Sequence, residues 1–415
     1  MTEGYEFRKR VAVIGGGAAG MMAAGTALSE GADVTLFEHT DRLGKKLAIT
    51  GKGRCNVTND CSVNEFLENV TRNHKFLYTA LYRFPPEKTI NFFEALGVEL
   101  KTERGQRVFP KNDKAKTIVD ALRRYCKDAK TLFENVTSVK KAQDGTLEVK
   151  TLKGSYQFDS VILATGGRSY PLTGSDGSGY RLAMKLGHSI TELSPSLVPI
   201  ESTSRLCTKM MGLSLKNVAI KAKDKIGNTV FSDFGEMMFT HFGITGPMVL
   251  SLSAHIDAKD LDGMTLSIDL KPALDEKTLD TRILSDFSKN NNKDLLNSLG
   301  ALLPSKMIEP FIEYCGIDPR KKVNSITREE RGIMIKALKG FSIPLSKLRP
   351  IEEAIITRGG INVKEIDPRT MESKICDGVY FAGEMIDVDA YTGGFNLQIA
   401  FSTGFIAGEN ASKLY

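Results

Sequence analysis

The 415-residue sequence contains no tryptophan, and its six cysteines form no CxxC pair. The lack of tryptophan excludes no function, but the scattered cysteines exclude a cysteine zinc site and a dithiol redox centre, and we expect no metal. No apolar run approaches the roughly 18 residues of a membrane span, so we expect no membrane partner. The polar start, MTEGYEFRKR, is unlike a signal peptide. These absences favour a cytoplasmic protein with reduced thiols.

The charge is balanced rather than concentrated. A net charge of +6 is small when 26% of the residues are charged. Because basic and acidic residues are interleaved, the composition suits a small anionic ligand such as a dinucleotide better than a nucleic acid. We therefore expect a small-molecule substrate and disfavour nucleic acid as a partner. Nothing in the sequence indicates the oligomeric state.

A glycine-rich turn after an apolar run predicts a dinucleotide-binding unit near the start. Residues 10–14, RVAVI, suit a buried parallel strand, and the helical pattern MMAAGTALSEG follows GGGAAG. In GxGxxG, Gly15 permits the tight turn, Gly17 lets the backbone approach a pyrophosphate, and Gly20 lets the helix pack on the strand. Glu38 ends the next strand, ADVTLFE, where its carboxylate can accept hydrogen bonds from an adenosine ribose. The motif by itself fits FAD and NAD equally.

Two further segments with glycine favour FAD. The loop at 50–56, TGKGRCN, brings Gly51, Arg54 and Cys55 soon after the ribose-binding acid and suits contact with the pyrophosphate and the ribityl chain. A solvated basic loop is the alternative. Thr165 and Gly166 close the apolar strand DSVILAT, which indicates a second approach of backbone to the ligand. A close-packed turn is the alternative there.

The C-terminal region carries a second set of nucleotide-fold signals. Gly383 and Glu384 end the strand GVYFAGE, and Asp387 follows, so a carboxylate can bind a ribityl hydroxyl. The turn TGGFNLQ then presents free amides at the start of the last helix, toward the flavin N1–O2 edge, where negative charge grows on reduction. A NAD domain has no need for such an element so far from the first, so the sequence predicts non-covalent FAD. The candidate contacts in this turn are Gly394, Phe395, Asn396 and Leu397.

The periodicity predicts an α/β fold with an insertion. From 198 to 270 the sequence alternates with period two, and from about 277 to 340 apolar residues recur at helical spacing. We therefore expect a Rossmann-like FAD-binding domain of the two-dinucleotide-binding-domain flavoprotein type, interrupted by another module. The expected bounds are 1–195 and 350–415 for the FAD-binding domain and 196–349 for the inserted domain, with 196–275 β-rich and 276–349 helical.

Several long segments carry a resemblance to a known family. They are VIGGGAAGMMAA, TGKGRCNVTN, ATGGRSYPLTGSDGSGY, GEMMFTHFGITGP, ITRGGI and YFAGEMIDVDAYTGGFNLQIAFSTG, and they span residues 13 to 404. In these segments the sequence resembles the HI0933-like (BaiN-type) family of NAD(P)/FAD-dependent oxidoreductases. The resemblance implies an FAD domain built from both ends of the chain and an inserted β-barrel-plus-helix module. It also implies FAD contacts by Gly15, Gly17, Ala18, Ala19, Glu38, Lys46, Arg54, Val136, Gly166, Asp387, Asn396 and Leu397.

Two departures from the broader flavoprotein pattern qualify this resemblance. No second GxGxxG follows a strand in the middle of the chain, so a dedicated NAD(P) domain is not expected. NAD(P)H, as the electron donor, would then bind transiently over the flavin. The late carboxylate motif reads Gly-Glu rather than Gly-Asp, which favours Asp387 over Glu384 for the ribityl role.

Three side chains are candidates for catalysis, each with a simpler alternative. His241, in the turn FTHFGITGP, can donate a proton or hold a carbonyl, or it can bond its own loop. The Cys55 thiol can attack or protonate, or it can be a small packing residue. Tyr391 can donate a phenolic proton or form an aromatic wall. Arg54 and Arg168 can bind an anionic substrate or the pyrophosphate.

The sequence thus predicts an FAD-dependent oxidoreductase. We expect hydride to pass from NAD(P)H through flavin N5 to an unsaturated or carbonyl-conjugated small molecule, while a side chain supplies the proton. One alternative is flavin-dependent modification of tRNA. Another is a redox-responsive FAD-binding regulatory protein that does not turn over a substrate.

Overall fold

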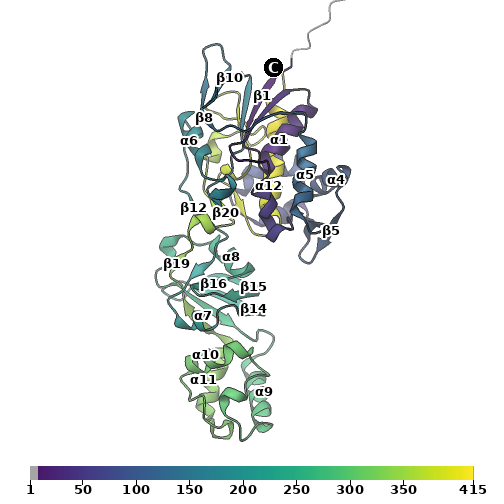
Figure 1. Cartoon of the computed structure of the whole chain (residues 1–415). Coiled ribbons are helices and arrows are strands. Elements are labelled where there is room, and N and C mark those ends of the chain that lie inside the picture. The colour runs from purple at the N-terminus through teal and green to yellow at the C-terminus, as the bar shows by residue number, and fades with distance from the viewer. Residues whose placement is uncertain (1–7, 415) are drawn as a thin grey trace, which may run out of the picture. The chain divides into compact units, whose positions relative to one another are not determined.

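The computed structural model describes residues 8–414, and the polar start at residues 1–7, where we expect no signal peptide, lies outside them. The chain divides into two compact units. Unit 1 consists of Met1–Ser196 and Ile351–Tyr415, and unit 2 is Leu197–Pro350. In Figure 1, unit 1 contains the purple and yellow ends of the chain, which lie side by side. No helix within residues 8–414 is long and apolar enough to cross a membrane.

Unit 1 is built on a five-stranded sheet in the order β21-β11-β1-β2-β7, with every neighbouring pair parallel. Ile14 pairs with both Leu163 and Phe37, so the strands end level with one another. The carboxyl ends of all five strands therefore meet at one edge, where ligands bind in open α/β sheets. The strands are β1 (Arg10–Ile14), β2 (Asp33–Phe37), β7 (Lys130–Leu132), β11 (Ser160–Leu163) and β21 (Val379–Phe381).

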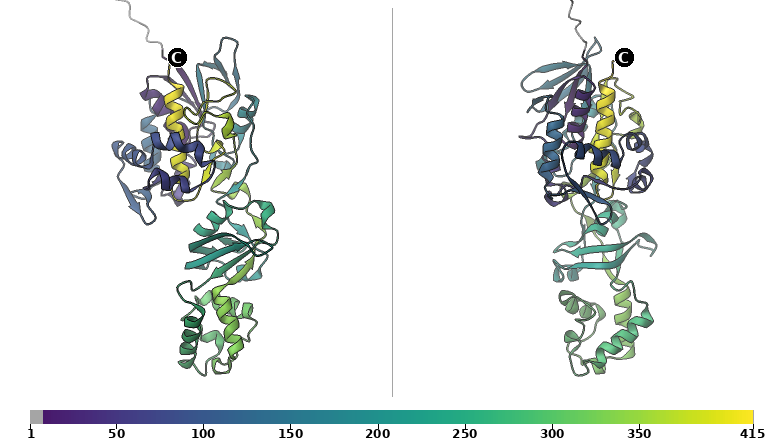
Figure 2. Two further views of the ribbon diagram at one scale, coloured as in Figure 1. Left: turned by 180° about the vertical axis from the view of Figure 1, so that it is seen from behind. Right: turned by 90° about the vertical axis from the view of Figure 1, so that its right-hand side faces the viewer.

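The first and last helices pack against each other because both present small residues. Helix α1 (Ala18–Ser29) reads AAGMMAAGTALS, and α12 (Phe395–Ala411) reads FNLQIAFSTGFIAGENA. A Cβ atom on Gly404 would lie 2.5 Å from the Ala19 carbonyl oxygen, and one on Gly408 would lie 2.4 Å from that of Ala23. The two helices therefore run in the same direction in close contact, and Figure 2 shows the yellow helix α12 within unit 1 from two further sides.

Smaller elements surround this sheet. A three-stranded antiparallel sheet has the order β10-β9-β8, another has the order β3-β6-β5, and two-stranded pairs join β22 to β4 and β12 to β20. The strands are β3 (Thr58–Asn59), β4 (Val70–Arg72), β5 (Leu100–Glu103), β6 (Arg107–Pro110), β8 (Val136–Lys141), β9 (Leu147–Thr151), β10 (Ser155–Phe158), β12 (Ser194–Ser196), β20 (Ile356–Arg358) and β22 (Asp389–Ala390). The helices are α2 (Val63–Glu68), α3 (Tyr78–Arg83), α4 (Pro86–Ala95), α5 (Ala115–Tyr125) and α6 (Ser178–Lys185).

Unit 2 combines an antiparallel sheet with helices. The sheet has the order β18-β17-β14-β15-β16-β13-β19. Within residues 197–350 no pairing joins the edge strands β18 and β19, so the closed barrel stays a prediction. The strands are β13 (Ile200–Glu201), β14 (Ser214–Lys223), β15 (Thr229–Phe239), β16 (Gly243–Thr245), β17 (Thr265–Asp269), β18 (Phe341–Pro344) and β19 (Lys347–Leu348). The helices are α7 (Arg205–Lys209), α8 (Pro247–Ser253), α9 (Glu276–Ser288), α10 (Ser305–Cys315) and α11 (Arg328–Lys339).

Candidate functional site

The turn before α1 leaves an open space where the glycine motif predicts a phosphate. Gly15 has a φ of +108°, and a Cβ there would lie 2.4 Å from the Ala164 carbonyl oxygen. A Cβ on Gly20 would lie 1.8 Å from the Gly15 carbonyl oxygen, whereas one on Gly17 would meet no atom within 4 Å. The Ala18, Ala19 and Gly20 amides are in the first turn, where a helix cannot use them. This helix end thus offers free donors and partial positive charge to an anion.

Glu38 lies at the carboxyl end of β2, beside this turn. Its Oε2 accepts a hydrogen bond of 2.9 Å from the Gly16 amide, and its Oε1 accepts one of 2.7 Å from the Thr40 amide. The side chain is buried. Since a carboxylate offers about four acceptor positions, two remain for hydroxyl donors such as those of a ribose. The two amide bonds fix the direction in which those positions point.

Lys46 and Glu384 form a polar hub that joins three ends of the sheet. The Lys46 ammonium donates to Glu384 Oε2 at 2.6 Å and to Ser169 Oγ at 2.7 Å. Glu384 Oε1 accepts from Ser169 Oγ at 2.9 Å and from the Thr357 amide at 2.9 Å. The Thr357 hydroxyl accepts in turn from the amides of Arg168 and Ser169. The hub therefore holds the segments after β2, β11 and β21 and strand β20 in one arrangement.

The loop after Lys46 adopts an uncommon backbone conformation. Gly51, Lys52 and Gly53 have φ values of +55°, +58° and +84°, and Cys55 has +61°. A lysine and a cysteine in this region carry a conformational cost of about 1 kcal/mol each, which surrounding contacts must offset. The Arg54 guanidinium supplies some of them, since it pairs with Glu103 and Asp113 and lies 4.2 Å above the Phe109 ring.

Cys55 is fully buried, and burial raises the pKa of its thiol to about 12. At neutral pH the thiol keeps its proton, and a thiol rather than a thiolate is a poor nucleophile. This environment favours the packing role for Cys55 over the catalytic one.

The N-terminus of α12 is tightly built. Gly394 has a φ of +100°, and a Cβ there would lie 2.3 Å from the Thr58 carbonyl oxygen. The Asn396 side chain accepts from the Ala390 amide at 3.0 Å and donates to the Ala390 carbonyl at 2.7 Å. The Phe395 ring is buried edge-to-face against Phe66. The first backbone amides of α12, including that of Leu397, have no partner within the helix and are available to a ligand.

Two carboxyl groups lie just before this turn. Asp387 is 3% exposed, and its Oδ1 lies 2.9 Å from Arg72 Nε in an ion pair. Asp389 is 1% exposed, and its Oδ2 accepts from Ser196 Oγ at 2.8 Å and from Thr71 Oγ1 at 3.0 Å. The pKa of Asp389 is raised, chiefly by burial.

The remaining candidates lie in different surroundings. Val136 begins β8 and is buried, and the Thr165 hydroxyl lies 3.7 Å from Met385 Sδ. Gly166 has a φ of +76°, and Gly383 has a φ of +78°. A Cβ atom on Gly383 would lie 2.8 Å from the Cβ of Ala19. Tyr391 donates its amide to the Asn69 carbonyl.

Two further candidates are exposed. The Arg168 guanidinium is about half exposed and lies 3.8 Å from Glu352. His241 belongs to unit 2, where its side chain is exposed and its carbonyl accepts from Thr208. A catalytic role for His241 therefore stays a prediction.

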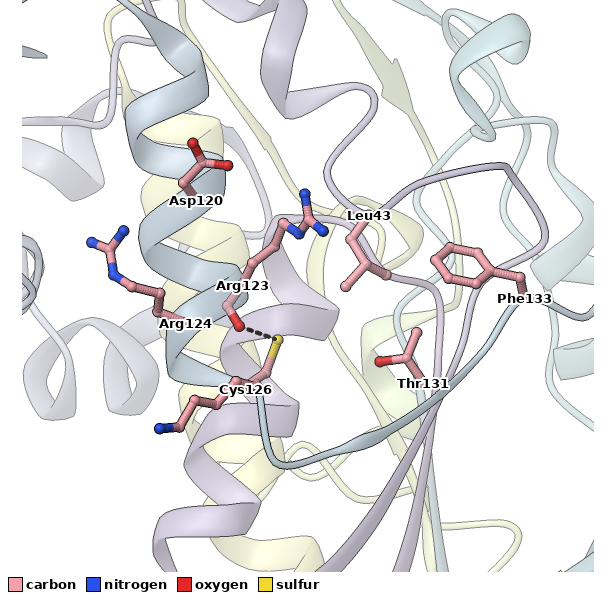
Figure 3. Close-up of a pocket in the computed structure, with 8 residues that line it drawn as sticks. Leu43, Asp120, Arg123, Arg124, Cys126, Thr131 and Phe133 are labelled. Atoms are coloured by element: carbon pink, nitrogen blue, oxygen red, sulfur yellow. Dashed lines mark hydrogen bonds between the residues drawn. The ribbon is translucent and has the colours of Figure 1, made fainter.

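A cavity of about 550 Å³ lies between α5 and β7. Figure 3 shows Arg123 extending from α5 toward Leu43, while Phe133 points to Leu43 from the opposite side and Arg124 projects away. Phe133 follows β7, and the neighbouring strand β2 is followed directly by Glu38. An aromatic ring and a cation near this acid are compatible with a planar, electron-rich group such as an adenine.

Sequence reasoning missed several residues that organise the site. Ser169 and Thr357 lie in the segments GGRSYP and ITRGGI, which were recognisable as motifs but gave no role for either hydroxyl. Arg72 has no local signal, because its partner Asp387 is brought to it only by the pairing of β4 with β22. Asn59 donates to the Gly393 carbonyl at 3.2 Å, a contact that likewise depends on tertiary structure.

Comparison with known proteins places this site in a family. The model of the HI0933-like protein Rossmann domain matches residues 9–410. The chain belongs to the HI0933-like family. The sheet of unit 1 and the turns at its carboxyl edge are accordingly those of a Rossmann-type FAD-binding domain.

Curated relatives cover nearly the whole chain. One is a 3-dehydro-bile acid delta(4,6)-reductase of Clostridium scindens, 30% identical, with 97% of this chain and 99% of the relative aligned. Ribosomal RNA dihydrouridine synthases of Escherichia coli and Haemophilus influenzae are 29% and 28% identical, with at least 96% of each chain aligned.

Solved structures share the fold at low sequence identity. A 3-ketosteroid-delta4-(5alpha)-dehydrogenase from Rhodococcus jostii RHA1 aligns with a TM-score of 0.53 and 15% identity over 100% of this chain and 99% of the other. A flavocytochrome c3 fumarate reductase aligns with a TM-score of 0.52 and 19% identity over 99% of this chain and 79% of the other. The chain thus shares its overall fold with flavoprotein oxidoreductases.

Proposed function

We propose that unit 1 binds FAD non-covalently and that the protein is an FAD-dependent oxidoreductase. The observation that carries this proposal is the offset between the starts of α1 and α12. The contacts of Gly404 with Ala19 and of Gly408 with Ala23 fix the register of these helices. At 1.5 Å per residue, α12 begins about 12 Å before α1 along their common direction. One helix end then suits the pyrophosphate, and the other suits the pyrimidine edge of a flavin joined to it by a ribityl chain.

The residues at the edge of the sheet fit such a cofactor. The open position at Gly17 leaves room for a phosphate beside the first turn of α1, and Glu38 keeps acceptor positions for the ribose. The unused amides at the start of α12 can stabilise negative charge on the flavin N1–O2 edge. When bound, FAD supplies hydride transfer at N5, and the chain supplies orientation, exclusion of water and a proton.

NAD(P)H is the proposed hydride donor, bound transiently. All strand pairs within residues 197–350 are antiparallel, so unit 2 lacks the parallel βαβ unit of a second nucleotide domain. A donor that has no domain of its own must approach the flavin directly and leave before the substrate enters.

The proposed substrate is a carbon–carbon double bond conjugated to a carbonyl. The name of the Clostridium scindens relative describes reduction of such a system. Hydride addition to the β carbon leaves negative charge on the carbonyl oxygen and requires a proton at the α carbon. Tyr391 and His241 are the candidate donors, because Cys55 is buried with a raised pKa.

Anaerobic titration tests this proposal. The purified protein should show a flavin absorbance spectrum that NADH or NADPH bleaches, and an added enone should restore it. Bleaching without reoxidation by any enone would contradict the substrate class. A flavin that neither nucleotide bleaches would contradict the donor and favour the redox-responsive regulatory alternative.

A second candidate function is reduction of a uracil base in ribosomal RNA. The names of two relatives favour it, and the chemistry is related, because the C5–C6 double bond of uracil is conjugated to the C4 carbonyl. Protein reduced with NAD(P)H would be incubated with ribosomal RNA fragments, and dihydrouridine would be measured by mass spectrometry. Flavin reoxidation by RNA but not by steroid-like enones would favour this candidate, and the reverse result would exclude it.

A further inference from the structure

Asp389 is a buried carboxyl group with one oxygen that nothing in the described chain satisfies. Its Oδ2 accepts hydrogen bonds from Ser196 and Thr71, while Oδ1 has no hydrogen-bond partner, although the residue is 1% exposed. Buried polar atoms without partners are rare because each costs about 1–3 kcal/mol. An unsatisfied oxygen at this depth indicates a group that the chain itself does not provide.

The position of Asp389 identifies where that group comes from. It lies between Asp387, the candidate ribityl contact, and the turn that begins α12, the candidate flavin contact. Both hydrogen bonds of the Asn396 side chain to Ala390 hold the residue after Asp389 against the first turn of α12. Pairing of Asp389 with Arg72 across β22 and β4 fixes it from the other side.

The surroundings of Asp389 favour the protonated carboxyl. Burial raises its pKa, and the hydroxyls of Ser196 and Thr71 and the charges of Arg72 and Arg358 lower it by a smaller amount. Asp387 is the neighbouring acid, and it is paired with Arg72. Since Oδ2 already accepts two hydrogen bonds, the proton belongs on Oδ1, which then needs an acceptor rather than a donor.

We propose that Asp389 is a positioning residue that is protonated when the cofactor is bound and donates a hydrogen bond, through Oδ1–H, to a hydroxyl or carbonyl oxygen of the ribityl–pyrimidine part of the cofactor. The inference rests on the proposed function, since it requires FAD in unit 1. It gives the two neighbouring acids different roles. Asp387 pairs with Arg72 and accepts hydrogen bonds, whereas Asp389 donates one.

The pH dependence of FAD binding follows from this role. A bound acceptor favours the protonated acid, so the pKa of Asp389 is higher in the complex than in the free protein. Affinity is constant at low pH and falls by up to tenfold per pH unit once the pH exceeds the pKa of the free protein. Asp389→Asn keeps a donor without a titrating proton, so its affinity should stay within about threefold of the wild type at pH 6. Its affinity should not fall as the pH rises.

The experiment measures the FAD dissociation constant of the full-length apoprotein between pH 6 and pH 9 by quenching of flavin fluorescence. The wild type should lose affinity with rising pH, and Asp389→Asn should not. Asp387→Asn is the matched control, since it should weaken binding at every pH and keep the wild-type slope. Ser196→Ala removes a donor to Oδ2 that favours the charged acid, so it should move the loss of affinity to higher pH.

Infrared spectroscopy of the same proteins provides a second readout. The carbonyl stretch of a protonated carboxyl group should be present at pH 6 and absent in Asp389→Asn. Equal pH slopes for the wild type and Asp389→Asn would overturn the inference, as would loss of binding by Asp389→Asn at every pH. If Asp389→Asn does not fold, the shift expected for Ser196→Ala decides the question. Absence of FAD binding by the wild type at any pH would instead overturn the proposed function.

Discussion

The two units of the chain differ in what they bury. Among residues 8–414, nineteen of the buried polar or charged residues belong to unit 1, and only Ser253, Asp286 and Ser298 belong to unit 2. Every buried side-chain nitrogen or oxygen atom without a hydrogen-bond partner among residues 8–414 lies in unit 1. Buried polar groups add little to stability compared with apolar packing. Their concentration in unit 1 indicates that this unit binds a polar ligand, whereas unit 2 has an ordinary apolar core.

The most damaging change should come from the turn before α1. Gly20→Val places side-chain atoms where even a Cβ would lie 1.8 Å from the Gly15 carbonyl oxygen. We expect a loss of more than about 4 kcal/mol and little folded protein. Gly332→Ala in α11 is the control, because a Cβ there meets no atom within 4 Å. This variant should be slightly more stable than the wild type. Circular dichroism during thermal unfolding measures both, and a folded Gly20→Val protein would contradict the close packing of α1 on β1.

A cavity in unit 2 should lower stability without touching the ligand site. Phe311 in α10 is completely buried, and Phe311→Ala should cost about 3–5 kcal/mol. Protein that remains folded should bind FAD as the wild type does. Chemical denaturation and a binding isotherm on the same sample check the two statements, and weaker FAD binding would break the distinction between the units.

Two ion pairs with equally exposed lysines sharpen the comparison. Lys46 bonds Glu384 in unit 1, Lys339 bonds Asp269 in unit 2, and each lysine side chain is 23% exposed. Lys46→Met and Lys339→Met should each cost about 1–3 kcal/mol of stability, because each leaves a partly buried carboxylate without its cation. Only Lys46→Met should also weaken FAD binding. If Lys339→Met weakens FAD binding equally, the hub around Lys46 has no special role.

The smallest effect is expected at Cys55. Cys55→Ala should leave turnover within about threefold of the wild type, because a thiol whose pKa is near 12 does no acid–base work at neutral pH. Cys207→Ala in unit 2 removes another buried thiol and should behave in the same way. Steady-state reduction of an enone with NAD(P)H compares them. Loss of turnover by flavin-loaded Cys55→Ala alone would restore Cys55 as a catalytic candidate.

Local signals made the Rossmann elements of unit 1 predictable. Residues 10–14 form β1, the helical pattern after GGGAAG is α1, and the last helix is α12, because these are set by apolar runs and glycine positions in the sequence itself. The segment 64–97 has helical periodicity, but Val70–Arg72 is a strand, since it pairs with Asp389–Ala390 from the far end of the chain. Strand β3 follows the predicted loop at 50–56 and pairs with β6.

The site was predictable only where a motif fixes the backbone. Gly15 and Gly20 lie in the close backbone contacts that the motif predicts, and Gly17 has an open side, while its contact with a pyrophosphate stays a prediction. Side-chain partnerships were not predictable. The pairing of Lys46 with Glu384 joins residues 338 positions apart, and no pattern in the sequence indicates it. Asp389 was overlooked because its surroundings are built from three separate segments that meet only in the folded chain.

Gly17 offers the most direct test of FAD binding by unit 1, because its open side is the space assigned to the pyrophosphate. The measurement is the FAD dissociation constant of the wild type, Gly17→Ala and the control Gly332→Ala. The account predicts that the wild type and Gly332→Ala bind FAD and quench its fluorescence. It predicts at least about tenfold weaker binding for Gly17→Ala at unchanged thermal stability. Equal affinities for all three proteins, or no binding of FAD by the wild type, would contradict it.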